Sequence, residues 1–257
     1  MPDLIVLLPA RDEESGIGEV IDRVPTSAIA EKGFGTRVVV VDGNSSDSTC
    51  EIAKSKGAEL IRQRSAPGKG WGVREALQVI FNEDEPNGDL LVMLDADATY
   101  RPEDLPRFID ELQVNDVVWG SRLRGRIEER AMSRTNRLGN KLLSLAASIL
   151  FMKRTTDLCT GYWGFRSSVL REISLSADGF TLEADLFGSV VKSKVKTKEI
   201  PIDYAHREGT STLKWYSDGP RILLMAIKKK FEYERNLIHD LLFISASAVL
   251  VWSVLAT

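Results

Sequence analysis

The feature that most constrains the fold is a series of short, mainly apolar runs that end in polar loops. Runs of this kind occupy residues 4–8, 37–41 and 90–94. They have the length of strands and show little alternation between polar and apolar residues, which is typical of strands buried on both faces of a sheet. Further strands are expected at 58–62 and 117–119, and helices from Ile17 to Val24, up to about Lys56, up to about Phe81 and from Pro102 to Leu112. Strands that alternate with helices across short loops predict an α/β fold with a mostly parallel sheet flanked by helices.

The composition is that of one large globular domain. The chain has 257 residues, of which 43% are hydrophobic, and this is enough for a sizeable core. A net charge of −3 gives no general case for nucleic acid as a partner. Cys50 and Cys159 lie far apart and form no metal-type spacing, so free thiols in a reducing compartment are expected.

Two carboxylates follow directly after the apolar run 90–94. Asp95 and Asp97 flank Ala96, and Pro102 then opens the next helix. Two acids at the end of a buried strand repel each other unless a positive group lies nearby. A divalent cation that carries nucleotide phosphates would satisfy them, because hard cations bind carboxylate and phosphate oxygens together. The simpler alternative is that Asp97 only caps the turn before the helix.

Other polar residues follow the neighbouring predicted strands. Arg11 and Glu13 come after the first strand, and Asp42 comes at the end of the second. Ligands of parallel sheets bind outside the carboxyl ends of the strands, so these residues and the two aspartates are expected in one site. The glycine patterns of dinucleotide-binding and P-loop proteins are absent from the sequence. Lys69, between Gly68 and Gly70, can bring a cation near a phosphate, or it can be a solvated lysine in a glycine turn.

The order of these motifs resembles a known family. It comprises Pro9-Ala-Arg-Asp-Glu13, Val41-Asp42-Gly-Asn-Ser-Ser-Asp47, Gly68-Lys69-Gly70, Asp95-Ala96-Asp97 and Gly120-Ser-Arg122. The chain is similar over about residues 3–215 to the inverting GT-A glycosyltransferases of family 2. More narrowly, it resembles the polyprenyl (dolichyl) phosphate mannosyl- and glucosyltransferases.

The resemblance implies a nucleotide sugar held by the first loops. It places Asp95 and Asp97 on Mg²⁺ or Mn²⁺ and assigns Asp97 to catalysis. It assigns the nucleotide to Pro9, Arg11, Glu13, Asp42, Lys69, Asp95, Ala96, Arg207 and Lys214. Arg207 and Lys214 belong to a loop expected to close over the phosphates. Gly43 and Thr99 stand where the family has an acid and often a glutamine, so the base and a third metal ligand stay open.

The segment between Trp119 and Leu142 is rich in arginine. It contains Arg122, Arg124, Arg126, Arg130, Arg134 and Arg137. Taken alone, such a run is more typical of a solvated loop. Beside a sugar-nucleotide site, however, planar guanidinium groups suit an anionic acceptor, because they can bind phosphate at two positions. The resemblance assigns Arg122 and Arg134 to the acceptor phosphate and to catalysis, with Arg137 as the alternative to Arg134.

Two acids in the second half are candidates for the sugar. Asp157 precedes a Gly-Phe-Arg segment like that of the family, where Trp163 could equally be a core residue. Glu183 opens a helix together with Asp185, and these acids could bind sugar or hold an arginine. The apolar helix expected over 138–152 would be core, or it would lie at a membrane surface and guide an isoprenoid chain.

The C-terminal part suggests contact with a membrane. We expect a catalytic domain over 1–216, an amphipathic juxtamembrane helix over 217–236 and a membrane anchor or truncated transmembrane segment over 237–257. Residues 241–257 carry no charge, although a buried core helix would explain this too. The lysines at 228–230 favour a membrane-associated protein with its catalytic domain facing the cytoplasm.

The predicted function is transfer of a hexose, mannose or glucose, to a polyprenyl phosphate. The donor would be GDP-mannose or UDP-glucose, and self-association is left open. A phosphate acceptor is already ionised at neutral pH and needs no general base. The alternatives are a transferase acting on a hydroxyl of a glycan or a small soluble acceptor, with Glu183 or Asp185 as base, and a non-enzymatic sugar-nucleotide-binding module.

Overall fold

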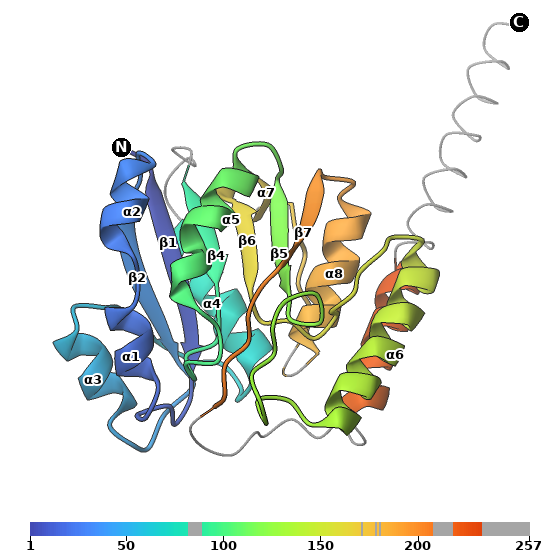
Figure 1. Ribbon diagram of the computed structural model, residues 1–257, viewed down its shortest axis with the longest axis horizontal. Helices are drawn as coiled ribbons and strands as arrows, with labels where there is room; N and C mark the ends of the chain where they lie inside the picture. The colour runs from blue at the N-terminus through green and yellow to red at the C-terminus, as the bar shows by residue number, and fades with distance from the viewer. Residues whose placement is uncertain (82–88, 171, 178, 180, 208–217, 233–257) are drawn as a thin grey trace, which may run out of the picture.

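The computed structural model describes residues 1–81, 89–170, 172–177, 179, 181–207 and 218–232. Its centre is a seven-stranded sheet with the order β3-β2-β1-β4-β6-β5-β7 (Figure 1). The strands are β1 Asp3–Ala10, β2 Gly35–Asp42, β3 Glu59–Arg62, β4 Leu90–Met93, β5 Val117–Ser121, β6 Trp163–Arg166 and β7 Thr197–Pro201. All pairs are parallel except those of β6, which runs antiparallel to β4 and β5. The expected α/β fold with a mostly parallel sheet is confirmed.

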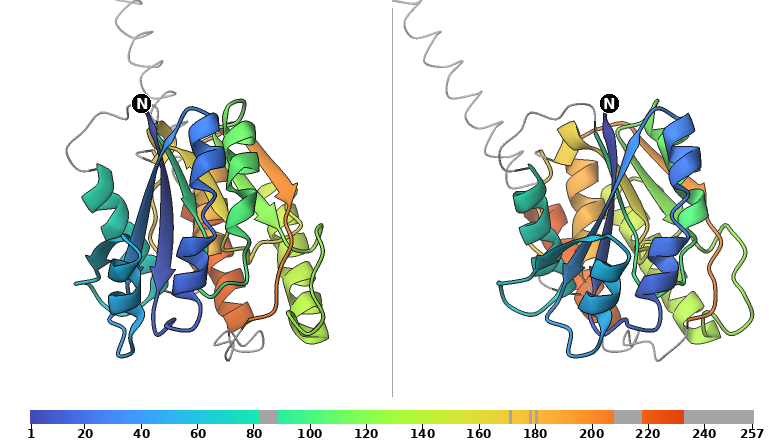
Figure 2. Two further views of the ribbon diagram at one scale, coloured as in Figure 1. Left: turned by 60° about the vertical axis from the view of Figure 1, so that its left-hand side comes forward. Right: turned by 90° about the vertical axis from the view of Figure 1, so that its left-hand side faces the viewer.

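Helices cover both faces of this sheet (Figure 2). They are α1 Ile17–Asp22, α2 Thr26–Glu31, α3 Thr49–Ser55, α4 Lys69–Phe81, η1 Pro102–Asp104, α5 Leu105–Leu112, α6 Arg134–Phe151, α7 Ser167–Leu170 and α8 Leu182–Lys192. A further helix covers 218–232. The predicted helices are present, and the structure adds the short helix α2, for which no prediction was made.

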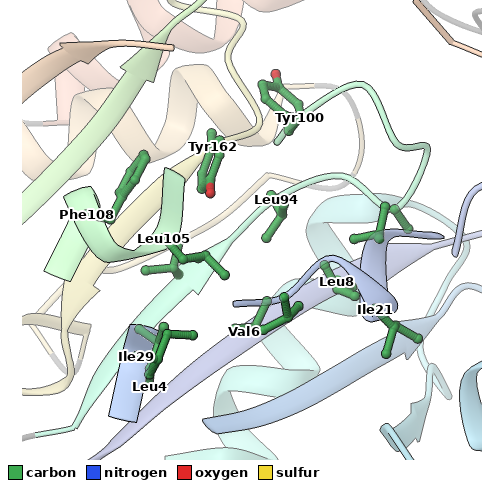
Figure 3. Packing of buried hydrophobic residues seen from close by; sticks show 14 of the residues in the cluster. Leu4, Val6, Leu8, Ile21, Ile29, Leu94, Tyr100, Leu105, Phe108 and Tyr162 are labelled. Atoms are coloured by element: carbon green, nitrogen blue, oxygen red, sulfur yellow. The ribbon is translucent and has the colours of Figure 1, made fainter. Parts of the chain in front are cut away.

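Strand β1 supplies side chains to two separate cores. Leu4, Val6 and Leu8 face the layer of α1, α2 and α5, where they pack with residues such as Phe108 (Figure 3). Ile5 and Leu7 face the opposite layer, formed by α4, α6, α8 and the helix 218–232. Because neighbouring residues of a strand point to opposite faces, a continuous apolar run is required, and this explains why β1 lacks polar alternation.

Strand β6 was not anticipated. Its Trp163 is 1% exposed and stacks on Trp119 of β5 at 5.3 Å between ring centroids. Of the two roles considered for Trp163, in the sugar pocket or in the core, the structure supports the core. Trp163 and Phe165 are aromatic residues that favour strands, but Gly164 between them weakens the pattern. The segment becomes one because it fills the gap between β4 and β5.

Helix α6 has two contrasting faces. Gly139, Asn140, Ser144 and Ala147 are buried against the body of the protein. On the outer face, Leu138, Leu142, Leu145 and Ile149 are between 57 and 70% exposed, which is unusual for large apolar side chains recurring at helical spacing. The helix begins earlier than expected because the Ser133 side chain accepts a hydrogen bond from the Asn136 amide.

The helix 218–232 packs on the same side of the sheet as α6 and α8. The buried ammonium group of Lys229 lies 2.8 Å from Asp185 of α8 and donates to the Ser174 carbonyl. No helix of the described residues is both long and apolar enough to span a bilayer. The predicted membrane segment 237–257 and the boundary at 216 lie outside the described residues.

Candidate active site

The two aspartates lie in the loop that follows β4. Asp95 is partly exposed and Asp97 is buried. Ala98 has a φ of 60°, a left-handed conformation that is unusual for a residue other than glycine. The resulting turn lets Asp97 accept hydrogen bonds from the amide and the hydroxyl of Thr99, at 3.1 and 2.6 Å. Thr99 therefore orients the Asp97 carboxylate, while Oδ2 stays directed at other partners.

Each aspartate is matched by a cation from a distant segment. Lys69, at the start of α4, places its ammonium nitrogen 2.6 Å from Asp95 and 2.8 Å from Glu183 of α8. Arg207 places one guanidinium nitrogen 2.6 Å from Glu13 and the other 3.3 Å from Asp97. Four segments thus converge on the carboxyl end of β4, as expected for a ligand site in a parallel sheet.

Backbone contacts hold the first loop against the aspartates. A Cβ on Gly16 would lie 2.9 Å from the Ala96 carbonyl oxygen, so only glycine permits this approach. On the other side, Ala205 donates to the Thr99 carbonyl at 2.8 Å, and this contact brings Arg207 to the site. Glu13, Ala96 and Arg207 are therefore brought together.

The other residues predicted to bind nucleotide lie in the same loops. Pro9 pairs with Val41 in the register of β1 and β2. Arg11 is exposed in the loop after β1, where it lies 3.7 Å from Asp12. Asp42 is buried at the end of β2 and accepts from the Ser45 amide. Lys214 lies outside the described residues.

The site contains more negative than positive side chains: the carboxylates of Glu13, Asp95, Asp97 and Glu183 are paired with Lys69 and Arg207. Burial and the charge of Asp95 raise the pKa of Asp97 above its usual value. Burial raises the pKa of Glu13 to about 7, against the opposing effect of Arg207. Burial is the larger cause of both shifts, because it disfavours the charged form of a carboxylate, and a bound cation would oppose it.

Asp95 and Asp97 fit a divalent cation shared with a phosphate. Their oxygens are the hard ligands that Mg²⁺ and Mn²⁺ prefer. Within the described part of the chain, no group of three or more acidic, histidine or cysteine side chains is suited to a metal. Arg207 supports this arrangement, because its buried Nε has no hydrogen-bond partner among the described residues and suits an added anionic oxygen.

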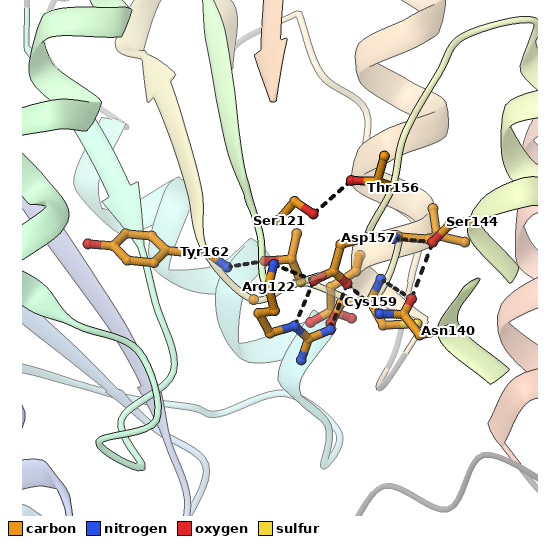
Figure 4. A network of polar contacts seen from close by, with 12 residues as sticks. Ser121, Arg122, Asn140, Ser144, Thr156, Asp157, Cys159 and Tyr162 are labelled. Atoms are coloured by element: carbon orange, nitrogen blue, oxygen red, sulfur yellow. Dashed lines mark hydrogen bonds and ion pairs between the residues drawn. The ribbon is translucent and has the colours of Figure 1, made fainter. Parts of the chain in front are cut away.

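Arg122 lies in a separate polar network beside this site (Figure 4). Its Nε and Nη2 donate to the two carboxylate oxygens of Asp157 at 2.8 and 2.7 Å, and Nη2 also donates to the Cys159 carbonyl. Asp157 is fully buried. With no exposed atom, Asp157 is better suited to holding Arg122 than to binding sugar, the role that the sequence suggested. The guanidinium lies 5.1 Å from the ring of Tyr204 and 6.0 Å from that of Tyr100.

Tyr100 connects this network to the aspartates. It follows Asp97 by three residues, and its hydroxyl accepts a hydrogen bond from the Gly161 amide at 2.7 Å. A Cβ on Gly161 would lie 2.6 Å from Asp95, so the chain passes directly beside that carboxylate. Arg122 and the aspartate pair therefore border one region of the molecule.

The remaining candidates are more dispersed. Arg134 and Arg137 are exposed on the first turn of α6. Glu183 is engaged by Lys69, and Asp185 is fully buried and engaged by Lys229. An arginine was one of the partners expected for these acids, but the partner is a lysine in both cases, Lys69 for Glu183 and Lys229 for Asp185. Asn140 and Ser144 were missed, although polar residues within a mainly apolar helix are a recognisable signal for a buried network.

Comparison with known proteins decides the family. Residues 5–174 match the family described as Glycosyl transferase family 2. The chain belongs to this family. It is 33% identical over 214 residues to Glycosyltransferase AglJ of Haloferax volcanii, covering 82% of the chain and 66% of AglJ. It is 34% identical over 224 residues to the Dolichyl-phosphate hexose transferase of the same organism, covering 86% of the chain and 90% of that protein.

A solved structure supports the same fold for this family 2 chain. Glucosyl-3-phosphoglycerate synthase from Mycobacterium tuberculosis, in complex with Mn²⁺, uridine diphosphate and glucosyl-3-phosphoglycerate, aligns with a TM-score of 0.66 and 18% identity. The alignment covers 90% of this chain and 80% of the synthase. The expected family and GT-A fold are thus confirmed. Since the chain spans less than two thirds of AglJ, some relatives contain substantial additional sequence.

Proposed function

We propose that this family 2 glycosyltransferase moves a hexose from a nucleotide sugar to a polyprenyl phosphate. The proposal is supported by the relative named Dolichyl-phosphate hexose transferase. The observation that carries it is the position of a buried arginine, Arg122, beside the aspartate pair and across the ring of Tyr100. Such an arrangement can receive two anions next to each other, one from the donor and one from the acceptor.

The donor would bind at the aspartates. Asp95 and Asp97 would hold Mg²⁺ or Mn²⁺, which supplies electrostatic stabilisation of the departing nucleoside diphosphate when bound. With the charge of the aspartates balanced by the metal, Lys69 would turn from Asp95 towards the diphosphate oxygens, and the Arg207 nitrogen that lies 3.3 Å from Asp97 would do the same. Glu13 would keep Arg207 in place, and the loops with Pro9, Arg11, Asp42 and Ala96 would hold the nucleoside.

The acceptor would bind at Arg122. A phosphate oxygen attacks the anomeric carbon, the bond from that carbon to the donor diphosphate breaks, and the nucleoside diphosphate leaves on the opposite face. The configuration at the anomeric carbon is inverted. A phosphomonoester is ionised at neutral pH, so no side chain has to remove a proton. Arg122 would position this oxygen against repulsion from the donor, assisted by Arg134 or Arg137.

The outer face of α6 supports association with a membrane. Its exposed leucines, together with Leu224 and Phe231 at 66% exposure on the helix 218–232, are suited to the interface of a bilayer. We further propose that the catalytic domain, residues 1–216, faces the cytoplasm and is followed by an interfacial segment, 217–236, and a membrane segment, 237–257.

A donor and acceptor screen tests this function. The protein is incubated with labelled GDP-mannose or UDP-glucose, Mg²⁺ or Mn²⁺, and either a polyprenyl phosphate or soluble hydroxyl acceptors. Label extracted into the organic phase supports the proposal. Metal-dependent label in a water-soluble product alone would contradict it, and would favour a hydroxyl acceptor with Glu183 as the base to be tested.

A further inference from the structure

Arg122, the arginine proposed to bind the acceptor, makes its side-chain hydrogen bonds through Nε and Nη2. Three of the five N–H groups of Arg122, those of Nε and Nη2, are directed at Asp157 and Cys159. Nη1 has no hydrogen-bond partner among the described residues. Asp157 also accepts from the Arg122 backbone amide at 2.9 Å, so it fixes both ends of this residue. The direction of Nη1 therefore depends on where the Asp157 carboxylate lies.

The position of Asp157 is in turn set from helix α6. Asn140 donates through its side-chain amide to Asp157 Oδ1 at 2.6 Å, the same oxygen that receives Nη2 of Arg122. Asn140 is 6% exposed. Its own orientation is fixed, because its carbonyl oxygen accepts from the Ser144 hydroxyl at 3.3 Å. The Ser144 hydroxyl oxygen also accepts from the Leu158 amide at 2.9 Å, which fixes the residue next to Asp157.

We propose that Asn140 is a positioning residue, which acts on Arg122 through Asp157 and so determines how the acceptor anion is received. The inference rests on the proposed function for the role of Arg122 only. It adds a residue from α6, the helix that also carries Ser144 and, on its exposed first turn, Arg134 and Arg137. A buried amide that donates to Asp157 and accepts from Ser144 is expected to restrict the motion of its partners.

The alternative is that Asn140 merely stabilises the packing of α6. Ser148 provides a matched control for that role. It lies on the same helix, its hydroxyl oxygen accepts from the Thr155 amide, and its hydroxyl donates to a backbone carbonyl. It thereby anchors α6 to the loop before Asp157 but touches neither Asp157 nor Arg122.

The test compares Asn140→Ala, Ser148→Ala and Asp157→Asn with the double variant N140A/D157N. We expect Asn140→Ala to raise the KM for the acceptor about tenfold, the effect of one lost hydrogen bond to a charged group, while the KM for the nucleotide sugar changes less than twofold. Ser148→Ala should leave both KM values within twofold of wild type. In the Asp157→Asn background, Asn140→Ala should raise the acceptor KM less than twofold further. An equal additional loss in that background, or a parallel rise in the donor KM, overturns the inference.

A second measurement does not depend on activity. The Nε–H signal of Arg122 in a ¹⁵N NMR spectrum should exchange slowly with water in wild type and in Ser148→Ala, and at least tenfold faster in Asn140→Ala. Unchanged exchange in Asn140→Ala would contradict the inference even if no acceptor were identified. If wild type transfers sugar only to a hydroxyl acceptor, the proposed function fails, while the KM comparison with that acceptor and the NMR signal still test Asn140.

Discussion

At the scale of single residues, the site is a balance of charges contributed by side chains far apart in the chain. Lys69 is paired with both Asp95 and Glu183, and Arg207 with both Glu13 and Asp97, so two positive charges face four carboxylates. The pKa of Lys69 illustrates the balance, because burial lowers it but the two carboxylates raise it above its ordinary value. These cations keep the acids compatible with a buried position until substrate brings its own charges.

Removal of one carboxylate charge should separate catalysis from folding. Asp97→Asn preserves the shape of the side chain and its hydrogen bonds from Thr99, but weakens the binding of a divalent cation. We expect the transfer rate to fall by about 10³-fold, since metal stabilisation of the leaving group contributes several kcal/mol. The melting temperature should stay near that of wild type. Transfer within tenfold of wild type would contradict the assignment of Asp97.

Replacement of Arg122 by lysine should weaken the binding of the acceptor and leave the binding of the nucleotide unchanged. Lysine keeps a positive charge beside buried Asp157, whereas alanine would leave that carboxylate unpaired at a cost of about 3–5 kcal/mol. Lysine cannot reproduce the planar fork, so Arg122→Lys should raise the acceptor KM about tenfold while the Kd of the nucleotide stays unchanged. Calorimetric titration with nucleotide measures the second quantity. A weakened nucleotide Kd would place Arg122 in the donor site instead.

At the scale of elements, the helix 218–232 is attached to the body by a buried ion pair. Lys229 and Asp185 are 7% and 0% exposed at their side chains, and Asp185 also accepts from the Ala177 amide. Lys229→Ala leaves a buried carboxylate without its cation and should reduce the free energy of unfolding by about 3–5 kcal/mol. Denaturant titration measures this loss.

Lys228 offers the matched control. Its side chain is 58% exposed and lies 4.0 Å from Glu232, so Lys228→Ala should change the free energy of unfolding by less than about 0.5 kcal/mol. Equal effects of the two substitutions would show that the buried pair does not anchor this helix.

The outer face of α6 should determine binding to lipid. Replacing both Leu142 and Leu145 by serine removes two exposed apolar side chains without touching the buried face that carries Asn140. We expect the affinity for vesicles, measured by sedimentation, to fall at least tenfold. Each leucine that becomes buried in the bilayer contributes about 1.5–3 kcal/mol to binding. Val79→Ser and Val114→Ser, at 60% and 59% exposure elsewhere on the surface, serve as controls. Equal losses in the controls would argue against a specific role for α6.

At the scale of the whole molecule, the stability of the fold should not depend on the bound metal, whereas the transfer activity should. The core is formed by two apolar clusters, one on each face of the sheet, and neither depends on a bound ion. Chelation by EDTA should therefore reduce transfer by more than about 10²-fold with little change in the melting temperature. Excess Mg²⁺ or Mn²⁺ should restore activity. Transfer that persists after dialysis against EDTA would show that Lys69 and Arg207 suffice for the leaving group.

Much of the fold could be read from local patterns. The strands β1, β2, β4 and β5 and most of the predicted helices are encoded by short-range periodicity, which depends only on neighbouring residues. The place of Asp95 and Asp97 in a site at the edge of the sheet could also be predicted, because polar residues that end buried strands of a parallel sheet meet at one edge. The family resemblance rested on these same motifs, and the family match covers residues 5–174.

Only the tertiary structure decided which side chains meet. Arg122 and Asp157 are 35 residues apart in sequence, Lys69 and Glu183 are 114 apart, and Glu13 and Arg207 are 194 apart. Sequence periodicity carries no information on such pairings, because an ion pair depends on the packing of whole elements against one another. Strand β6 is the clearest case: its residues become a strand because two neighbouring strands offer unpaired backbone groups on either side. The same packing directs Asp157 to Arg122 and buries Asn140 behind it.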